Sequence, residues 1–290
     1  MKRPQHYNIN LDRLEITYTA SEDFRKYLED RDEAIFDGCL RLIRKDPQKY
    51  HHEFAVWCTG ESPTEFDTLM GYLYFGSPNP NRPDFYFSFT NESLYSEFLL
   101  ASRFYLEEAM PLSFKQISKI DIAVDFSFNI VRELYRLYKD ETCVLLVNGR
   151  TIGSMDERVA AVVHIAGDNT RKRPLANPSF NIDNKDHSLT FKAYNKTKEI
   201  DDNSKKEYIR DNAGFNRLYR LEVSCGNHKM LKKSLESLNM HEDDVYGLLQ
   251  DEKTLRHIFI DFLNRLIRYR QKPNMRKPRC ILEYLLKDVE

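Results

Sequence analysis

The sequence predicts an α+β protein with mostly antiparallel sheets and separate packed helices. Two observations carry this prediction: runs with a period of two occur in groups, and helical runs stand apart from them instead of following each strand. A third observation is that the region after residue 229 is almost wholly helical in pattern. The sequence therefore favours antiparallel sheets with a helical C-terminal region.

The first third of the chain predicts a strand, a helical segment and a meander. Residues 11–18 alternate apolar and polar side chains, as a strand does. Ser21 and the acids after it predict a helix start, and apolar positions at helical spacing continue to Pro47, which indicates one helix or a helix pair. Strand-like runs separated by Gly and Pro follow at 53–58, 69–75 and 84–90.

The rest of the chain mixes both element types. We expect helices at 94–110 and 130–139, on either side of a strong strand at 119–126. Further strands are predicted at 143–147, 158–165, 188–195 and 218–225. We place a domain at 1–226 and a helical, basic C-terminal region at 227–290. The strand-rich halves 53–126 and 143–225 are also what a diverged internal duplication would give.

Composition narrows the class of protein. Charged residues make up 31% of the chain and the net charge is −1, so any nucleic-acid surface must be local. The five cysteines form no Cys-x-x-Cys pair, which argues against a metal knuckle and favours a reduced, cytoplasmic compartment. The polar N-terminus predicts no secretion signal, and no apolar stretch is long enough to predict a membrane span.

The strand at 119–126 carries two carboxylates on one face. Asp121 and Asp125 share that face with only the small Ala123 between them. Two such acids repel each other unless a cation or water screens them, and Mg²⁺ or Mn²⁺ takes oxygen ligands of this kind. A solvated strand face is the simpler alternative, which these residues alone do not exclude.

The strand at 218–225 adds a third acid. Leu221 and Val223 are expected to face a core, so Arg220 and Glu222 share the opposite face. Glu222 is then a predicted metal ligand, with an ordinary Arg/Glu ladder on a sheet surface as the alternative.

A tyrosine between two lysines is the candidate nucleophile. On the strand that ends near residue 195, Lys192, Tyr194 and Lys196 share a face. A phenol titrates near about pH 10, and adjacent ammonium groups favour its ionised form. Because most of the 17 tyrosines must be packing residues, the prediction for Tyr194 depends on this context.

Four motifs, taken in order, resemble a known family. They are LDRLEIT (11–17), IDIAVD (120–125), YNKTKE (194–199) and YRLEV (219–223). Together they resemble the Rep_trans-type replication initiation factors, which comprise rolling-circle initiators of plasmids and phages and related relaxases. The stretch 169–185 lacks the Gly-Ser-Arg-Ser sequence associated with plasmid members, so the source stays open.

The resemblance implies a metal-dependent DNA nicking and strand-transfer enzyme. Its tyrosine matches Tyr194, which would form a 5′-phosphotyrosyl link and release a 3′-hydroxyl. Lys196 would neutralise a phosphate oxygen or the phenolate. Asp121 or Asp125, with Glu222, would hold Mg²⁺ or Mn²⁺, and the choice between the two aspartates is left open. Glu199 would be a helix cap or part of the metal shell.

The implied partners follow from the same resemblance. They are origin DNA with an unpaired or extruded hairpin nick site, a host helicase and a polymerase, and the family often acts as homodimers. Positive charge gathers near the C-terminus, with no acid between Leu263 and Cys280. The predicted DNA-binding residues are Lys192, Arg220, Arg265, Arg268, Arg270, Lys272, Arg276, Lys277 and Arg279. A solvated basic helix end is the alternative for the C-terminal group.

Three other functions stay open at this point. A mobilisation relaxase would use the same chemistry at a transfer origin. A non-catalytic origin-binding initiator or repressor would explain the basic C-terminus but not the acidic strands. A nuclease with metal-activated water would use the same carboxylates and leave Tyr194 as a packing residue.

Overall fold

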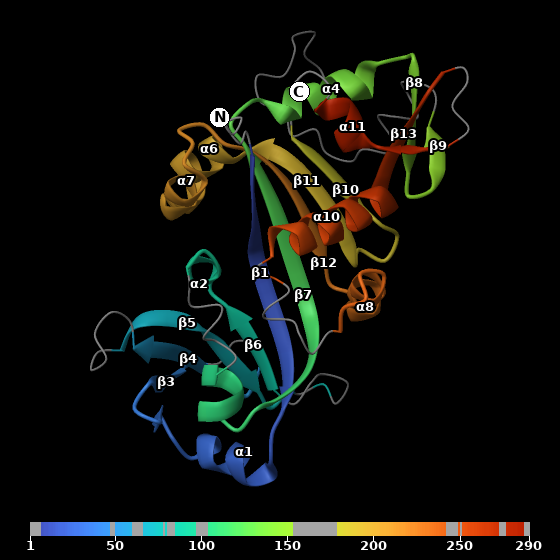
Figure 1. Cartoon of the computed structure of the whole chain (residues 1–290). Coiled ribbons are helices and arrows are strands. Elements are labelled where there is room, and N and C mark those ends of the chain that lie inside the picture. Colours follow the sequence, from blue (N-terminus) through green and yellow to red (C-terminus); the bar gives the residue numbers. More distant parts are fainter. Residues whose placement is uncertain are drawn as a thin grey trace. The chain divides into compact units, whose positions relative to one another are not determined.

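The computed structural model describes residues 7–46, 50–59, 66–77, 79, 85–96, 104–152, 179–241, 249, 251–272 and 277–286 (Figure 1). The chain divides into two compact units, each assembled from separate stretches. Unit 1 comprises residues 1–10, 121–227 and 252–290, and unit 2 comprises residues 11–120 and 228–251. The predicted division at residue 226 differs from this one, because residues after 251 belong with the strands of unit 1.

Unit 1 contains two antiparallel sheets. The first has the order β10, β11, β12, β7, β1, and the second has the order β14, β13, β8, β9. The strands are β1 (Tyr7–Thr19), β7 (Ser113–Phe126), β8 (Cys143–Val147), β9 (Arg150–Ile152), β10 (Phe180–Asp183), β11 (Leu189–Asn195), β12 (Tyr219–Cys225), β13 (Ile267–Gln271) and β14 (Arg279–Cys280). Strands β1 and β7 contribute residues to both units.

Helices pack on one face of the first sheet in unit 1. They are α4 (Ile130–Lys139) and α10 (Glu252–Leu266), which both contact β11 and β12 (Figure 1). Phe191, Leu221 and Val223 of the sheet are fully buried, as are Phe259 and Phe262 of α10. This apolar layer fixes which side chains point to the opposite face. The remaining helical segments are α6 (Lys196–Glu199), η2 (Ile200–Ser204), α7 (Tyr208–Ala213) and α11 (Ile281–Leu285).

Unit 2 is a meander with helices on its apolar face. The strand order is β7, β1, β6, β5, β4, β3, β2. Its own strands are β2 (Glu33–Phe36), β3 (Leu40–Lys45), β4 (His52–Thr59), β5 (Phe66–Phe75) and β6 (Phe85–Phe89), and its helical segments are α1 (Glu22–Glu29), α2 (Asn91–Leu94), η1 (Phe104–Ala109) and α8 (His228–Glu236). Ser21 caps α1 by accepting from the Phe24 amide, as its position predicts.

The α+β prediction is confirmed, with three local differences among the described residues. Residues 33–45 form the β2–β3 hairpin and not the end of a helix, because Asp37 and Gly38 adopt positive φ angles of 50° and 66° and turn the chain. Residues 267–271 form strand β13 where a helix was expected. The predicted helix at 94–110 is α2 and η1, with 97–103 outside the described residues. The predicted strand at 158–165 also lies outside them.

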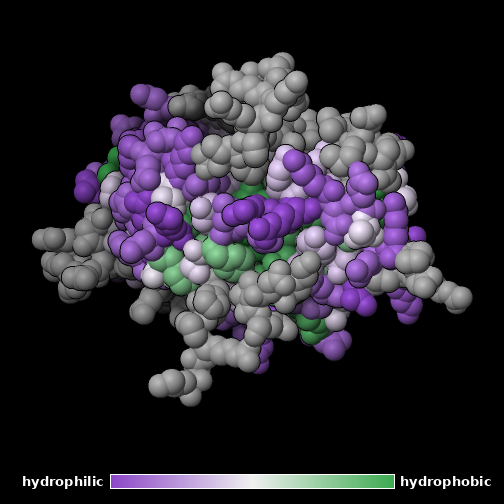
Figure 2. Space-filling model, turned by 90° about the horizontal axis from the view of Figure 1, so that it is seen from above, coloured by the Kyte–Doolittle hydropathy of each residue, from purple (hydrophilic) through white to green (hydrophobic). Residues whose placement is uncertain are grey.

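On the face shown in Figure 2, the described residues are mostly hydrophilic, with hydrophobic residues toward the centre of the view. Among the described residues, no helix has the length and apolar character needed to cross a membrane.

Candidate active site

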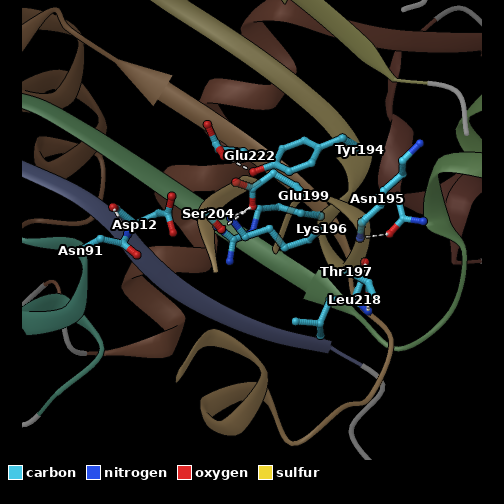
Figure 3. A network of polar contacts seen from close by, with 12 residues as sticks. Asp12, Asn91, Tyr194, Asn195, Lys196, Thr197, Glu199, Ser204, Leu218 and Glu222 are labelled. Atoms are coloured by element: carbon cyan, nitrogen blue, oxygen red, sulfur yellow. Dashed lines mark hydrogen bonds and ion pairs between the residues drawn. The ribbon is translucent and has the colours of Figure 1, made fainter. Parts of the chain in front are cut away.

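Tyr194 and Glu222 meet on the face of unit 1 that points away from α10. In the β11–β12 register, Lys192 lies opposite Glu222 and Tyr194 lies opposite Arg220, so these four side chains share one face. The Tyr194 hydroxyl donates a hydrogen bond of 2.9 Å to Oε2 of Glu222 (Figure 3). Tyr194 is half-buried and the Glu222 side chain is 9% exposed. The phenolic proton therefore already has a carboxylate acceptor.

Two ammonium groups lie around this phenol. Lys192 Nζ is 3.6 Å from Oε1 of Glu222, the oxygen that Tyr194 does not contact. Lys196 Nζ is 5.9 Å from the centroid of the Tyr194 ring. Lys192 is exposed and Lys196 is buried, so a ligand could reach the first lysine while the second sits in a drier environment.

Local helix geometry holds Lys196 in place. Asn195 caps α6 by accepting from the Lys198 amide at 3.0 Å, so the helix begins directly after the tyrosine strand. Lys196 Nζ then reaches Oε2 of Glu199, one turn later, at 2.6 Å. Ser204 donates to the same oxygen at 3.2 Å. Glu199 was expected to be a cap or part of a metal shell, and the structure makes it the carboxylate partner of Lys196.

Arg220 and Asp125 form a buried ion pair beside the tyrosine. Arg220 Nε donates to Oδ1 of Asp125 at 2.8 Å, and a second guanidinium nitrogen donates to Oδ2 at 2.6 Å. Both side chains are 0% exposed. The guanidinium of Arg220, a predicted DNA contact, therefore lies in the interior. Both oxygens of Asp125, a predicted metal ligand, are bonded to Arg220.

The three predicted metal ligands do not come together as one site. Asp121 accepts a hydrogen bond from Ser224 of the neighbouring strand, and Glu222 is bonded to Tyr194. Within the described ranges, no group of three His, Cys, Asp or Glu side chains is placed to hold an ion. The alternation along β7 did put Asp121 and Asp125 on one face, as predicted, but the register pairs them with different partners.

A thiol at the end of β12 is not a competing nucleophile. Burial raises the pKa of the Cys225 thiol to about 11. The thiol stays protonated at neutral pH, and a protonated thiol is a poor nucleophile.

The described basic residues of the C-terminal region lie in α10, on strands β13 and β14 and beside these strands. Arg268 and Arg270 lie on β13 and are half-buried, whereas Lys272, Lys277 and Arg279 are exposed. Arg265 ends α10 and pairs with Asp261 at 2.8 Å, and Arg279 lies 3.8 Å from Glu283. Arg276 is outside the described residues. The described members of the predicted positive patch thus lie on α10, on strands β13 and β14 and next to these strands, and two of them are paired to acids.

No protein-family model matches the chain, and no curated protein matches its sequence. Among solved structures, the chain is similar to a rolling circle replication initiator protein from Geobacillus stearothermophilus, with a TM-score of 0.46 and 13% identical residues. The match covers 98% of this chain and 96% of that one.

Proposed function

We propose that this chain starts rolling-circle DNA replication by nicking one DNA strand with Tyr194 as the nucleophile. One observation carries the proposal: the Tyr194 hydroxyl donates to the Glu222 carboxylate at 2.9 Å, with the ammonium groups of Lys192 and Lys196 around the pair. The order of the sequence motifs supports the same assignment, because the tyrosine of YNKTKE is this residue.

The reaction is a transesterification at phosphorus. Glu222 takes the phenolic proton while the Tyr194 oxygen attacks the scissile phosphate. The new bond joins the tyrosine oxygen to phosphorus, and the bond from phosphorus to the 3′-oxygen breaks. The departing 3′-oxygen receives a proton and becomes a 3′-hydroxyl, while the protein keeps the 5′-phosphate. The reverse sequence rejoins the strand, so no cofactor energy is needed.

The two lysines have different roles in this scheme. The exposed Lys192 neutralises Glu222 and can also contact a phosphate oxygen. Through this contact Lys192 binds and orients DNA. The buried Lys196, held by Glu199, stabilises negative charge on the phenol oxygen or the phosphate as the bond forms. A charge held in a drier environment acts more strongly, so we expect Lys196 to contribute more to the rate.

The resemblance also implies a divalent cation, Mg²⁺ or Mn²⁺. The predicted set of three acids does not fit one ion as it stands, because Asp125 is bonded to Arg220. Asp121 and Glu222 lie on the neighbouring strands β7 and β12, and an ion held there would need further oxygen ligands from DNA or water. We propose that nicking requires this cation, which the reactions with Mg²⁺, Mn²⁺ or EDTA test.

The proposed substrate is origin DNA, which the protein recognises by its sequence and which carries an unpaired or extruded nick site. Among the described members of the C-terminal basic set, Arg265, Lys272, Lys277 and Arg279 are exposed, and we propose that they contact phosphates. A host helicase, a polymerase and a homodimeric state are proposed with the function.

The direct test uses supercoiled DNA cloned from the chain's own coding region with its flanks. Purified wild-type protein should convert it to nicked circles and leave a protein–DNA adduct that survives denaturing electrophoresis. Tyr194→Phe should bind the DNA and form no adduct. Glu222→Gln keeps the shape of the acceptor but cannot take the proton, so it should form adduct slowly. Parallel reactions with Mg²⁺, Mn²⁺ or EDTA test the cation.

Each outcome separates the alternatives. Nicking without an adduct would favour a nuclease that uses activated water. DNA binding without nicking, unchanged in Tyr194→Phe, would favour a non-catalytic initiator or repressor. Either result would overturn the proposal. A relaxase would form the same adduct but nick at a transfer origin, which the position of the nick identifies.

A further inference from the structure

The outer face of the sheet in unit 2 carries a row of aromatic side chains. The register places Tyr74 opposite both Tyr86 of β6 and Glu53 of β4, and it places Tyr72 opposite Ala55 of β4. Side chains directly opposite each other share a face, so the aromatic residues of β4, β5 and β6 lie on one side of the sheet. Trp57, two residues beyond Ala55, is on the same side. We call Tyr50, Tyr72, Tyr74 and Trp57 the aromatic platform.

The tyrosine rings contact one another across the face. The centroids of Tyr50 and Tyr74 are 5.4 Å apart, and those of Tyr72 and Tyr74 are 6.4 Å apart. Tyr86 lies below this group, with centroids 5.8 Å from Tyr74 and 6.2 Å from Tyr50. All four members of the platform are half-buried. The residues next to them along the strands point to the other face of the sheet and form the core, as Phe54, Leu73 and Phe75 do.

Cations and acids both lie around the platform, and Glu53 lies on its face opposite Tyr74. On the β1 side, Arg13 is paired with Glu15 at 2.7 Å, and its side chain is 47% exposed. On the β3 side, Arg41 is paired with Glu33 at 2.9 Å and is 40% exposed, and Lys45 is exposed. Burial raises the pKa of Tyr74 to about 12. The rings therefore stay neutral at physiological pH and do not repel phosphates.

This arrangement has the two parts that single-stranded nucleic acid needs. Bases stack on aromatic side chains irrespective of sequence, and cations at the edge of the surface contact the backbone. A sheet face that presents aromatic rings between basic margins is one way in which proteins hold unpaired bases. Duplex DNA keeps its bases stacked on each other, so it cannot use the rings.

We propose that the aromatic platform binds unpaired bases of single-stranded DNA at a place separate from Tyr194. That the nucleic acid is DNA rests on the proposed function, and the other parts of this inference do not. It assigns unit 2 a binding activity of its own, by which an initiator would retain an unpaired strand.

The sole tryptophan gives a direct readout, because Trp57 belongs to the platform. Titration of the full chain with an oligothymidine of about twelve nucleotides should quench its fluorescence, since that length spans a site of the size found in stacking proteins. A hairpin duplex with the same number of bases should quench much less. Anisotropy of a labelled oligonucleotide measures the affinity independently.

Three variants define the contribution of the rings. Tyr72→Ala combined with Tyr74→Ala should weaken binding about tenfold or more, which corresponds to about 1.4 kcal/mol. Tyr72→Phe combined with Tyr74→Phe keeps the rings and should bind as the wild type does. Tyr27→Ala removes another exposed tyrosine of unit 2, on α1, and serves as the matched control. If the double alanine variant unfolds early in a thermal melt, Tyr72→Ala alone carries the same expectation.

The result that overturns the proposal is binding that the alanine variants leave unchanged. Equal quenching by the duplex would overturn it too, because stacking needs unpaired bases. The outcome is independent of the nicking chemistry. A wild type that binds the oligonucleotide but never forms an adduct with origin DNA would refute the proposed function while the platform stands.

Discussion

Each unit contains a described tyrosine–glutamate pair, and the surroundings of the two pairs differ. In unit 1 the Tyr194 hydroxyl donates to Glu222, and lysines lie 3.6 Å from the carboxylate and 5.9 Å from the ring centroid. In unit 2 the Tyr86 hydroxyl donates to Glu15, whose other oxygen is bonded to Arg13. The neighbours of Tyr86 are the rings of Tyr50 and Tyr74.

The difference shows that a carboxylate-bonded phenol is not by itself a nucleophile. Burial, followed by the charge of Glu15, raises the pKa of Tyr86 well above that of a free phenol. Such a phenol keeps its proton and acts as a hydrogen-bond donor in the sheet. Around Tyr194, two ammonium groups are present to compensate negative charge on the oxygen. This difference supports the proposal that Tyr194 is the nucleophile and that Tyr86 has a structural role.

The largest expected effect comes from removal of the Tyr194 hydroxyl. We expect Tyr194→Phe to lower adduct formation by more than about a thousandfold, because the nucleophilic oxygen is lost. Quantitative denaturing electrophoresis with supercoiled origin DNA measures it. A variant that still formed adduct at a tenth of the wild-type level would place the nucleophile elsewhere.

The buried ion pair beside Tyr194 should control stability. Asp125→Asn leaves the Arg220 charge buried without its counterion, and we expect a loss of about 3–5 kcal/mol in the free energy of unfolding. Urea denaturation followed by circular dichroism measures it. The double variant Asp125→Leu, Arg220→Met removes both charges and should recover much of the loss. Unchanged stability in Asp125→Asn would contradict a structural role for the pair.

The lysine beside Glu222 should have a smaller effect on rate. Lys192→Ala removes an exposed cation, and because solvent screens exposed charges we expect adduct formation to fall only about tenfold. Single-turnover nicking with saturating DNA separates this effect from binding. Lys198→Ala is the control, since Lys198 is an exposed lysine of α6, the short helix that follows the strand of Lys192 and Tyr194. Equal losses in both variants would indicate general attraction of DNA and not a role at the site.

The Tyr86 hydroxyl should contribute modestly to folding. Tyr86→Phe removes one donor from Glu15 while Arg13 remains bonded to it, so we expect about 1 kcal/mol of destabilisation in urea denaturation. A loss as large as that of Asp125→Asn would show that this pair holds unit 2 together.

Alkaline pH should destabilise the folded protein through Tyr74 and Tyr86, with little effect below about pH 10. Burial raises the folded-state pKa of Tyr74 and Tyr86 above the unfolded value of about 10. The folded state holds these protons more tightly, so the stability they give is present below that pH and lost as the pH rises beyond it. The urea concentration at the midpoint of unfolding should fall as the pH rises above about 10. A rise in that midpoint would contradict the raised pKa of these tyrosines.

The sequence alone predicted much of the architecture and the tyrosine strand. The alternation in residues 188–195 and 218–225 predicted β11 and β12, and the lysines around Tyr194 are visible in the sequence. The β2–β3 hairpin was missed because Ile35, Cys39 and Ile43 also fit helical spacing, although Asp37-Gly38 is a turn signal. Which acid meets which base depends on strand register, and no local pattern encodes that Asp125 pairs with Arg220 across 95 residues.

The most direct test of the account is to identify the residue that becomes attached to DNA. Wild-type protein is reacted with origin DNA, digested with nuclease and protease, and analysed by tandem mass spectrometry. We predict a peptide in which Tyr194 carries the 5′-phosphate of a nucleotide. A nucleotide on any other residue, or complete nicking with no modified peptide, would contradict the assignment of Tyr194 as the nucleophile.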